Sequence, residues 1–217
     1  MLKVPVGLSV CAFLFVLSGP AFAGSALTVE AAVNNCQNRH IDLEPRISAC
    51  NALIHSGLIS HKMLGVFYMM RGKAYADAKD DANAMQDFDT ALEKFPALAD
   101  AHIERGLLYY RESDNPHALA DLDEAVAEAP DAYAPSLMRC EVRLSTNANP
   151  AGALGDCEVA VKAKPQDADA LEWRGRAHLA LGQCAEARAD FGAAATSDPS
   201  RAGSLPSADS CRPPVTP

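Results

Sequence analysis

The sequence predicts an all-α protein built from repeated helix-turn-helix units. Three observations lead to this prediction: a period near 34 residues, an abundance of alanine with only 6% aromatic residues, and prolines that close each period. Alanine has the highest intrinsic helix propensity, whereas β-sheets favour β-branched and aromatic residues. With 217 residues, 49% of them hydrophobic, the chain is long enough for one or two globular domains with a substantial core.

The negative net charge of the chain argues against some classes of binding function. It has 19 Lys and Arg against 28 Asp and Glu, which gives a formal net charge of -9. An acidic surface is repelled by the phosphates of nucleic acids and by anionic lipids. We therefore expect no binding to nucleic acid or to a membrane surface.

The first 23 residues have the pattern of a secretory signal peptide. Lys3 is followed by an apolar run from Val10 to Leu17, and Ala21 and Ala23 are the small residues expected before a cleavage site. The alternative is an uncleaved anchor, but a membrane-spanning helix needs about 20 apolar residues and this run is shorter. The prediction is an exported, periplasmic protein that is free of the membrane after cleavage.

Cysteine usage agrees with export. Of seven cysteines, Cys11 leaves with the signal peptide. An even number remains, which suggests disulfides formed in an oxidising compartment. The remaining cysteines are Cys36, Cys50, Cys140, Cys157, Cys184 and Cys211. They allow 15 pairings, and their number alone does not choose among these.

Four units in phase define the repeat. A glycine slot recurs with spacings of 34, 34 and 35 residues, at Gly72, Gly106, Cys140 and Gly175. The extra residue of the third unit falls between Ser145 and Pro150, in a stretch with turn-forming residues. An insertion inside a helix would rotate its apolar face by about 100°, so an insertion in this stretch indicates two helices joined by a turn.

The repeat resembles the tetratricopeptide family, in which a large residue, glycine, aromatic, alanine, aromatic, alanine and proline follow in fixed order. The first unit has Tyr68, Gly72, Tyr75, Ala84, Phe88, Ala91 and Pro96 in these slots. The next two have His102, Gly106, Tyr109, Ala118, Leu122, Ala125 and Pro130, then Ser136, Cys140, Arg143, Ala153, Cys157, Ala160 and Pro165. The last has Leu171, Gly175, His178, Ala187, Phe191, Ala194 and Pro199. The resemblance implies a right-handed α-solenoid in which each unit packs on its neighbour.

The repeats divide the chain into segments. After the signal peptide (1–23), residues 24–64 are expected to form a degenerate N-terminal hairpin that caps the stack, with helices from Val29 to Asn38 and from Pro45 to His55. The four repeats are expected at 65–98, 99–132, 133–167 and 168–201, followed by a tail at 202–217 that lacks helical periodicity.

The repeat also suggests how the cysteines pair. Cys140 occupies the glycine slot and Cys157 the second aromatic slot, which face each other across one hairpin. The other expected disulfides are Cys36–Cys50, which flanks the turn of the degenerate hairpin, and Cys184–Cys211. The last would pin the tail across the apolar face of the final repeat, which has no following helix. If the tail does not cover that face, the face is open to self-association.

The cysteines have an alternative reading in thiol-redox chemistry or metal handling. No Cys-x-x-Cys motif occurs, and His40, four residues after Cys36, is the one histidine two to four residues from a cysteine. This spacing is poor for metal ligands or a redox pair. Disulfides with a structural role are the better interpretation.

The sequence offers no catalytic motif, cofactor site or metal site. It lacks His-Glu-x-x-His, a Gly-rich phosphate loop and Gly-x-Ser-x-Gly. His102 and His178 occupy repeat slots, where we expect them to pack. Several carboxylates are expected at turns or on solvated helix surfaces: Asp77, Asp80, Asp81, Asp87, Asp89, Asp121 and Asp123. A hydrolase would need a convergent buried cluster, so the chain is not expected to be an enzyme.

The resemblance places partner contacts on the concave side of the first helix of each repeat. The predicted groove residues are Met69, Lys73, Ala76, Asp77, Ile103, Leu107, Tyr110, Arg111, Leu137, Glu141, Leu144, Ser145, Glu172, Arg176, Leu179 and Ala180. The apolar ones would form a stripe that fits a peptide, or several would pack against neighbouring second helices. The Lys, Arg and Asn cluster with which some members bind chaperone C-termini is missing.

These observations predict a scaffold or adaptor that binds a protein or peptide partner. It would act as a monomer or a weak homodimer. The alternative function is a thiol-redox or metal-handling envelope protein that uses its cysteines.

Overall fold

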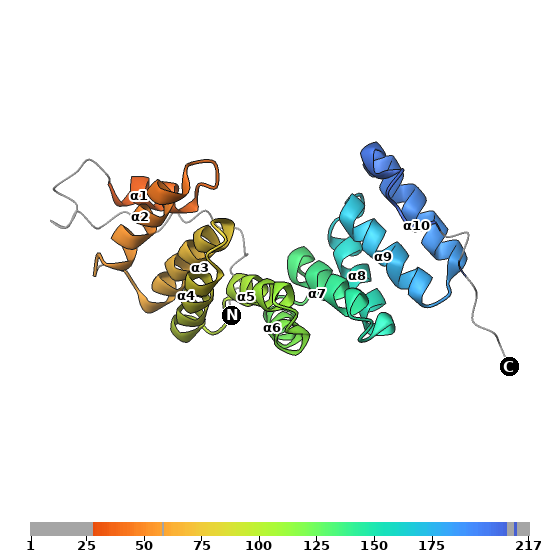
Figure 1. Cartoon of the computed structure of the whole chain (residues 1–217), viewed down its shortest axis with the longest axis horizontal. Coiled ribbons are helices and arrows are strands. Elements are labelled where there is room, and N and C mark those ends of the chain that lie inside the picture. Colours follow the sequence, from red (N-terminus) through yellow and green to blue (C-terminus); the bar gives the residue numbers. More distant parts are fainter. Residues whose placement is uncertain (1–27, 58, 208–210, 212–217) are drawn as a thin grey trace, which may run out of the picture. The chain divides into compact units, whose positions relative to one another are not determined.

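A computed structural model describes residues 28–57, 59–207 and 211. The predicted signal peptide lies outside these residues, as do positions 208–210 and 212–217 of the tail. The described residues form helices and no β-strand, so the all-α prediction is confirmed (Figure 1). The helices are α1 Val29–Gln37, α2 Leu43–Ile54, α3 His61–Asp77, α4 Asp81–Lys94, α5 Ala99–Arg111, α6 Asn115–Glu128, α7 Tyr133–Ser145, α8 Pro150–Ala163, α9 Ala168–Ala180 and α10 Cys184–Ser197, and a 3₁₀ helix follows at Pro199–Arg201.

The chain divides into two compact units, one ending at Pro96 and the other beginning at Ala97. The first unit contains α1 to α4, and the second contains α5 to α10 with the 3₁₀ helix. The degenerate hairpin and the first matching repeat therefore share a unit, which the period did not predict.

Helices α5, α7 and α9 begin at Ala99, Tyr133 and Ala168, which are the first residues of the ranges given above to the last three repeats. The boundary predicted between residues 64 and 65 is wrong, because it lies inside α3. This helix begins four residues earlier, at His61, where the Oγ of Ser60 accepts a hydrogen bond from the N–H of Met63 at 3.4 Å. An N-cap serine satisfies one of the free N–H groups of a first helical turn, and this signal was available in the sequence.

The turn inside each matching repeat has one conformation. In the first repeat the N–H of Asp80 donates to the carbonyl of Tyr75 at 2.9 Å, and the N–H of Lys79 donates to the carbonyl of Ala76 at 3.1 Å. This is the Schellman pattern, which places a residue in the left-handed region. The residues at that position are Lys79, Ser113, Asn147 and Gly182, with φ of 63°, 64°, 51° and 71°.

The extra residue of the third repeat lies in its turn, as predicted. In the first repeat Asp80 both completes the Schellman pattern and caps α4, because its side chain accepts the N–H of Asn83. In the third repeat two residues share these tasks. Ala148 donates to the carbonyl of Arg143, and the side chain of Asn149 caps α8. Both helices keep their faces, because the insertion changes only the link between them.

The glycine slot lets the two helices of a repeat approach closely. A Cβ atom on Gly72 would lie 2.7 Å from Cε1 of Phe88, and one on Gly175 would lie 2.6 Å from Cε1 of Phe191. Both distances are too short for non-bonded carbon atoms. The third repeat has Cys140 and Cys157 in these two slots, and both are completely buried.

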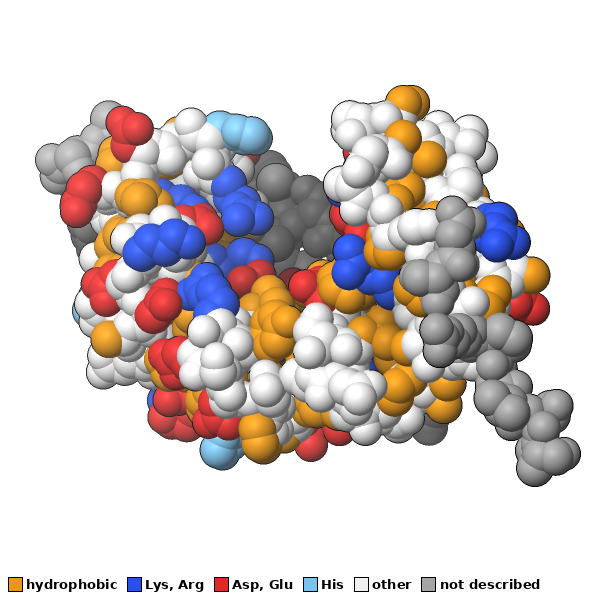
Figure 2. Space-filling model, turned by 45° about the vertical axis from the view of Figure 1, so that its right-hand side comes forward, with side chains coloured by type: hydrophobic (Ala, Val, Ile, Leu, Met, Phe, Trp, Pro, Cys, Tyr) orange, Lys and Arg blue, Asp and Glu red, His pale blue; other side chains and the backbone are white. Residues whose placement is uncertain are grey.

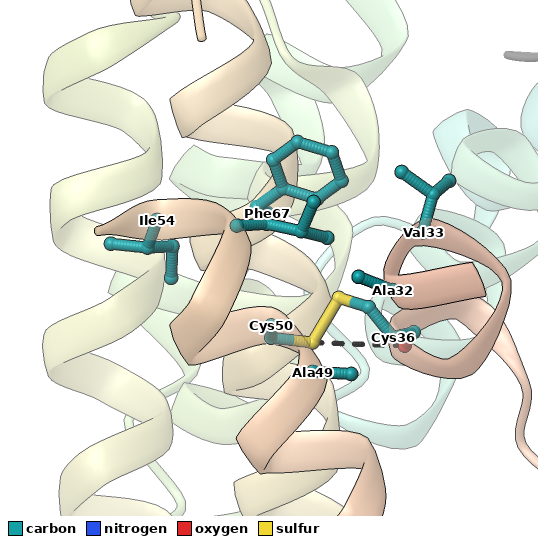
Figure 3. Packing of buried hydrophobic residues seen from close by; sticks show 8 residues of the cluster. Ala32, Val33, Cys36, Ala49, Cys50, Ile54 and Phe67 are labelled. Atoms are coloured by element: carbon teal, nitrogen blue, oxygen red, sulfur yellow. Dashed lines mark hydrogen bonds between the residues drawn. A yellow bond between two sulfur atoms is a disulfide. The ribbon is translucent and has the colours of Figure 1, made fainter. Parts of the chain in front are cut away.

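The core of the first unit gathers around the Cys36–Cys50 disulfide. Figure 3 shows this bridge between α1 and α2, with Ala32 and Ala49 beside it and Phe67 of α3 packed in the same cluster. Phe67 is only 2% exposed. The degenerate hairpin thus shares one hydrophobic core with the helix that follows it.

Candidate protein interface

The predicted groove residues lie on the first helices of the repeats, α3, α5, α7 and α9. Within the second unit, α5 contacts α7 and α7 contacts α9, so these three first helices lie side by side. On the face of the molecule drawn in Figure 2, hydrophobic side chains are mixed with Lys, Arg, Asp and Glu side chains.

Three apolar members of the predicted groove are buried, which corrects the expectation for them. Met69, Ile103 and Leu137 are 6%, 7% and 3% exposed. Ile103 packs in a cluster with Leu122 and Val142, because its helix position faces the next repeat.

Leu137 makes the equivalent contact one repeat further on. It packs with Val161 of α8 and Leu171 of α9. The alternative left open by the sequence, that part of the stripe packs against neighbouring helices, therefore holds for Ile103 and Leu137. The partly exposed apolar residues that remain are Leu107, Tyr110, Leu144 and Leu179.

The second unit has one partly buried carboxylate on this side without a hydrogen-bond partner. Glu141 of α7 forms no hydrogen bond or ion pair with any other described residue. Burial raises the pKa of its carboxyl group, the negative charge of Asp169 raises it further, and Arg176 opposes both effects. An ionised Glu141 therefore favours a cation brought by a partner.

The neighbouring charges of α9 are already paired. Arg176 donates to Glu172 at 2.7 Å, and its guanidinium lies 4.8 Å from the ring centre of Trp173. Arg201, beyond α10, donates to Asp169 at 2.5 Å and to Glu172 at 3.3 Å. Glu172 and Arg176 are thus committed mainly to each other.

In the first unit, the predicted groove residue Asp77 has a structural role. It accepts hydrogen bonds from Arg46 at 2.7 Å and from Arg39 at 3.4 Å. Burial opposes its ionisation, but the hydrogen bond from Arg46 and the charge of Arg39 outweigh burial and lower the pKa of Asp77. Arg46 is 3% exposed, so the pair ties the degenerate hairpin to the end of α3. The remaining predicted contacts of this unit are Lys73 and Ala76, both partly exposed.

An ion pair between a partly exposed arginine and a buried aspartate joins the two helices of every matching repeat, and the predicted site residues do not include it. The arginine just before the glycine slot donates to the aspartate just before the second aromatic slot. The pairs are Arg71–Asp87 at 2.6 Å, Arg105–Asp121 at 2.7 Å, Arg139–Asp156 at 2.5 Å and Arg174–Asp190 at 2.5 Å. In each pair both guanidinium Nε and Nη2 donate, so the geometry is bidentate.

The placement of Asp87 and Asp121 on solvated surfaces was therefore wrong. They are 3% and 5% exposed. The signal was present in the sequence, because both members of the pair recur with the period of the glycine slot.

Two histidines lie beside these aspartates, as packing residues rather than surface groups. Nδ1 of His102 is 3.0 Å from Oδ1 of Asp121, and Nε2 of His178 is 3.7 Å from Oδ2 of Asp190. Burial opposes the ionisation of Asp121, but hydrogen bonds from Arg105 and His102 prevail and lower its pKa. A carboxylate held in this way by an arginine links the two helices of the hairpin.

The disulfides of the structure are the three expected pairs. Their Cα atoms lie 4.9 Å apart in Cys36–Cys50, 5.5 Å in Cys140–Cys157 and 5.6 Å in Cys184–Cys211. The first two bridges are completely buried, whereas both cysteines of the third are partly exposed. Reagents in solution therefore reach the three bridges to different degrees.

No group of three or more His, Cys, Asp or Glu side chains among the described residues is arranged to hold a metal ion. No helix within the described ranges has both the length and the apolar character needed to cross a membrane.

Stacked helical hairpins with a partly apolar inner face define a helical-repeat protein of the interaction class. The sequence matches the tetratricopeptide repeat family model over residues 69–133 and 144–202, which is more than half of the chain. The chain belongs to the tetratricopeptide repeat family. No curated protein matches it significantly.

Solved structures show the same fold. MamA is 18% identical, with a TM-score of 0.61 over 75% of this chain and 92% of MamA. YrrB, described as a TPR protein with an unusual peptide-binding site, is 22% identical, with a TM-score of 0.59 over 64% of this chain and 71% of YrrB. A tetratricopeptide repeat protein from Parabacteroides merdae is 14% identical, with a TM-score of 0.63 over 79% of this chain and 67% of that protein.

Proposed function

We propose that the chain is a non-catalytic scaffold of the periplasm that binds a segment of a partner protein on the first-helix face of its second unit. Tetratricopeptide repeats are in general protein-interaction modules, and this membership supports the class of function. The observation that carries the site is the combination of partly exposed Leu107, Tyr110 and Leu144 with the unpartnered carboxylate of Glu141.

This combination favours a particular partner chemistry. Apolar side chains of a bound segment would cover Leu107, Tyr110 and Leu144, and a lysine or arginine would pair with Glu141. Because the helices hold these residues in place before binding, little ordering entropy opposes capture. The expected partner segment is therefore apolar with at least one basic residue.

The proposed compartment rests on the sequence of residues 1–23 and on the even number of mature cysteines. Structural disulfides persist in oxidising compartments and are rare in the cytosol. A thiol-redox role would have to use Cys184–Cys211, because the other two bridges are completely buried. We propose the protein as a monomer when all three bridges are closed.

A peptide library displayed on phage tests the groove. The mature chain is the bait, and selected peptides are then measured against variants by calorimetry. Tyr110→Ala and Glu141→Gln should each weaken binding by about tenfold, which corresponds to about 1.4 kcal/mol. Glu124→Gln on the exposed side of α6 is the matched control and should leave affinity unchanged. Equal affinity for all three variants would place the binding site elsewhere.

A further inference from the structure

The three disulfide bridges differ in how far solvent reaches them. Cys36–Cys50 and Cys140–Cys157 are completely buried, and each lies inside a hydrophobic cluster. Both cysteines of Cys184–Cys211 are partly exposed. Exchange between a thiol and a disulfide begins when a thiolate attacks one of the two sulfur atoms, so its rate depends on access. Cys184–Cys211 is therefore the bridge that an external thiol reaches first.

The place of α10 does not depend on this bridge. Ala187 and Ala194 are completely buried and Phe191 is 6% exposed, so the helix buries an apolar side without help from the bridge. Arg174 of α9 donates to Asp190 of α10 through two nitrogen atoms. These contacts remain when a sulfur–sulfur bond at the start of the helix opens. Reduction of the bridge therefore leaves α9 and α10 packed, and the bridge is able to close again.

Cys184 is the first residue of α10, where the helix favours a negative charge. The N-terminus of a helix presents free N–H groups and a positive partial charge. In the other matching repeats the N-cap side chain of the second helix accepts one of these N–H groups, and these side chains are Asp80 in α4, Asp114 in α6 and Asn149 in α8. Gln183, the N-cap residue of α10, forms no such bond, and its Oε1 lies 2.6 Å from Nδ1 of His178 instead. A thiolate at Cys184 thus meets a helix end whose first N–H groups no N-cap side chain occupies.

This position makes Cys184 the better leaving group of the two cysteines. A helix N-terminus stabilises a thiolate, and the sulfur that is more stable as a thiolate leaves a disulfide faster. Cys211 lies outside any helix. Glu186 in the first turn of α10 is negatively charged, but it is exposed, so water and salt screen its effect. An attacking thiolate is therefore expected to bond to the sulfur of Cys211 and to expel the sulfur of Cys184.

We propose that Cys184–Cys211 is a thiol–disulfide exchange site, at which a protein dithiol forms a mixed disulfide with Cys211 and expels the thiolate of Cys184. The reactant belongs to the class of oxidoreductases that carry two closely spaced cysteines. The proposal does not depend on the proposed groove, because none of the groove residues takes part in the exchange.

A partner with two thiols fits this site better than a partner with one. The Cα atoms of Cys184 and Cys211 are 5.6 Å apart, so the expelled thiolate stays beside the mixed disulfide. It attacks that bond and expels a single-thiol reactant again, which restores the bridge. A dithiol prevents this return, because its own second thiol competes for the mixed disulfide and closes a disulfide in the partner.

The exchange balances in two steps. In the first, a thiolate of the dithiol bonds to Sγ of Cys211, and the bond between the two cysteine sulfurs breaks with its electron pair on Cys184, which takes up a proton. In the second, the other thiolate of the dithiol attacks the partner sulfur of the mixed disulfide and expels Cys211 as a thiolate, which is protonated. Two electrons and two protons pass from the dithiol to the bridge, and the dithiol becomes a disulfide.

Graded reduction tests the site. The oxidised protein is incubated with increasing dithiothreitol, alkylated and digested for mass spectrometry. Cys184 and Cys211 should be alkylated at reductant concentrations at least about tenfold below those that open the other two bridges. Circular dichroism at those concentrations should show unchanged helicity. Simultaneous opening of all three bridges, earlier opening of a buried bridge or a loss of helicity would overturn the proposal.

Glutathione tests the direction of attack. The oxidised protein is incubated with glutathione, the products are trapped with a fast alkylating reagent, and the modified peptides are mapped. The main product should carry glutathione on Cys211 and the alkyl group on Cys184. Equal amounts of the two possible adducts, or an excess of glutathione on Cys184, would contradict the assignment of the leaving group.

Two matched variants test the role of the helix end. Gln183→Asp gives α10 the capping carboxylate that α4 and α6 have, and it should slow reduction by about threefold, because the carboxylate competes with the thiolate of Cys184 for the same N–H groups. Ala151→Asp adds the same charge at an exposed position in the first turn of α8 and should leave the rate unchanged. Equal slowing in both variants, or none in Gln183→Asp, would contradict this role.

A trapping experiment tests the class of the reactant. A small oxidoreductase of the Cys-x-x-Cys type, with its second cysteine replaced by serine, should accumulate as a mixed disulfide with Cys211. The C184S/C211S variant is the control and should form no such product. If glutathione opens the bridge but the trap forms no mixed disulfide, the site does not accept a protein dithiol and the proposed reactant is wrong.

Discussion

Four arginines reach from the first helix of a repeat to an aspartate on the second, and Arg105–Asp121 illustrates what these contacts do. Both carboxylate oxygens of Asp121 accept from the guanidinium, and His102 lies against one of them. Burying the carboxylate of Asp121 is costly, so the net contribution of the pair to stability is small, but the buried carboxylate left without its arginine is destabilising. The pair therefore fixes how the two helices are aligned.

A double-mutant cycle measures this pair. Arg105→Ala should lower the free energy of unfolding by about 2 kcal/mol, because Asp121 stays buried with only His102 against it. Asp121→Ala should lower it by less, because the guanidinium of Arg105 is partly exposed to water. The double variant should lose clearly less than the sum, as determined by urea denaturation. Glu124→Ala on the same helix as Asp121 should change stability by less than about 0.5 kcal/mol. Strict additivity would show that the two side chains act independently.

Acid should weaken the fold through the same residues. The pKa values of Asp121, Asp77 and Asp167 are lowered in the folded protein: burial opposes ionisation, but hydrogen bonds from Arg105, Arg46 and Tyr133 respectively outweigh it. A lowered folded pKa contributes stability that is complete above the unfolded value, about 3.9, and is lost as the pH falls through the folded value. The midpoint of urea unfolding should therefore fall steadily below about pH 4. A constant midpoint between pH 5 and pH 2 would contradict these directions.

At the scale of the element, the four Schellman turns have the same backbone conformation but different residues at the position with positive φ. Only Gly182 is a glycine, whereas Lys79, Ser113 and Asn147 adopt the left-handed conformation with side chains. This conformation costs an ordinary residue about 1–2 kcal/mol, and asparagine less. The turns of the first two repeats therefore store backbone strain.

Substitution at two turns should have opposite effects. Ser113→Gly should raise the free energy of unfolding by about 0.5 kcal/mol, because relief of strain exceeds the added freedom of the unfolded chain. Gly182→Ala should lower it by about 1 kcal/mol. Thermal and urea unfolding of both variants measure the difference, and shifts of the same sign would exclude strain as the cause.

The sequence predicted the elements well where their signals are local. Prolines force the preceding residue into an extended conformation, and each second helix ends there, as α4 does at Lys94 before Phe95 and Pro96. The start of α3 was missed because the repeat pattern begins only at its large residue, while the helix continues upstream to the cap at Ser60. The family pattern fixes the residues in its slots, but it does not fix where the first helix of the first matching repeat begins.

At the scale of the whole molecule, the division into two units and the burial of two predicted groove residues depend on contacts that the 34-residue period does not predict. The division between Pro96 and Ala97 falls between two units that match the same pattern. The burial of Ile103 and Leu137 follows from the neighbouring repeat, because a helix position three before the glycine slot faces partly inward and partly toward the next hairpin. The repeat pattern places the candidate groove residues on one side of the first helices. Which of these residues are buried and which are exposed depends on contacts with the neighbouring repeat, which the pattern does not contain.

Export is the prediction that belongs to the whole chain. When the full sequence is expressed in a Gram-negative bacterium, the protein should be recovered from the periplasmic fraction. Its intact mass should lack residues 1–23 and should show no alkylation before reduction. Ala23→Asp should block cleavage at this site, because the peptidase requires small residues there. A full-length cytoplasmic product with free thiols would contradict the proposed compartment.

The three disulfides join cysteines that are consecutive along the chain from Cys36 onward, at separations of 14, 17 and 27 residues. A chain that meets an oxidant as it emerges, N-terminus first, therefore presents each correct partner before the cysteine of the next pair arrives. Vectorial oxidation gives the native pairing directly, whereas an interleaved pattern would require an isomerase to break and reform bridges. The order of the cysteines along the sequence therefore allows all three bridges to form without rearrangement when oxidation proceeds from the N-terminus.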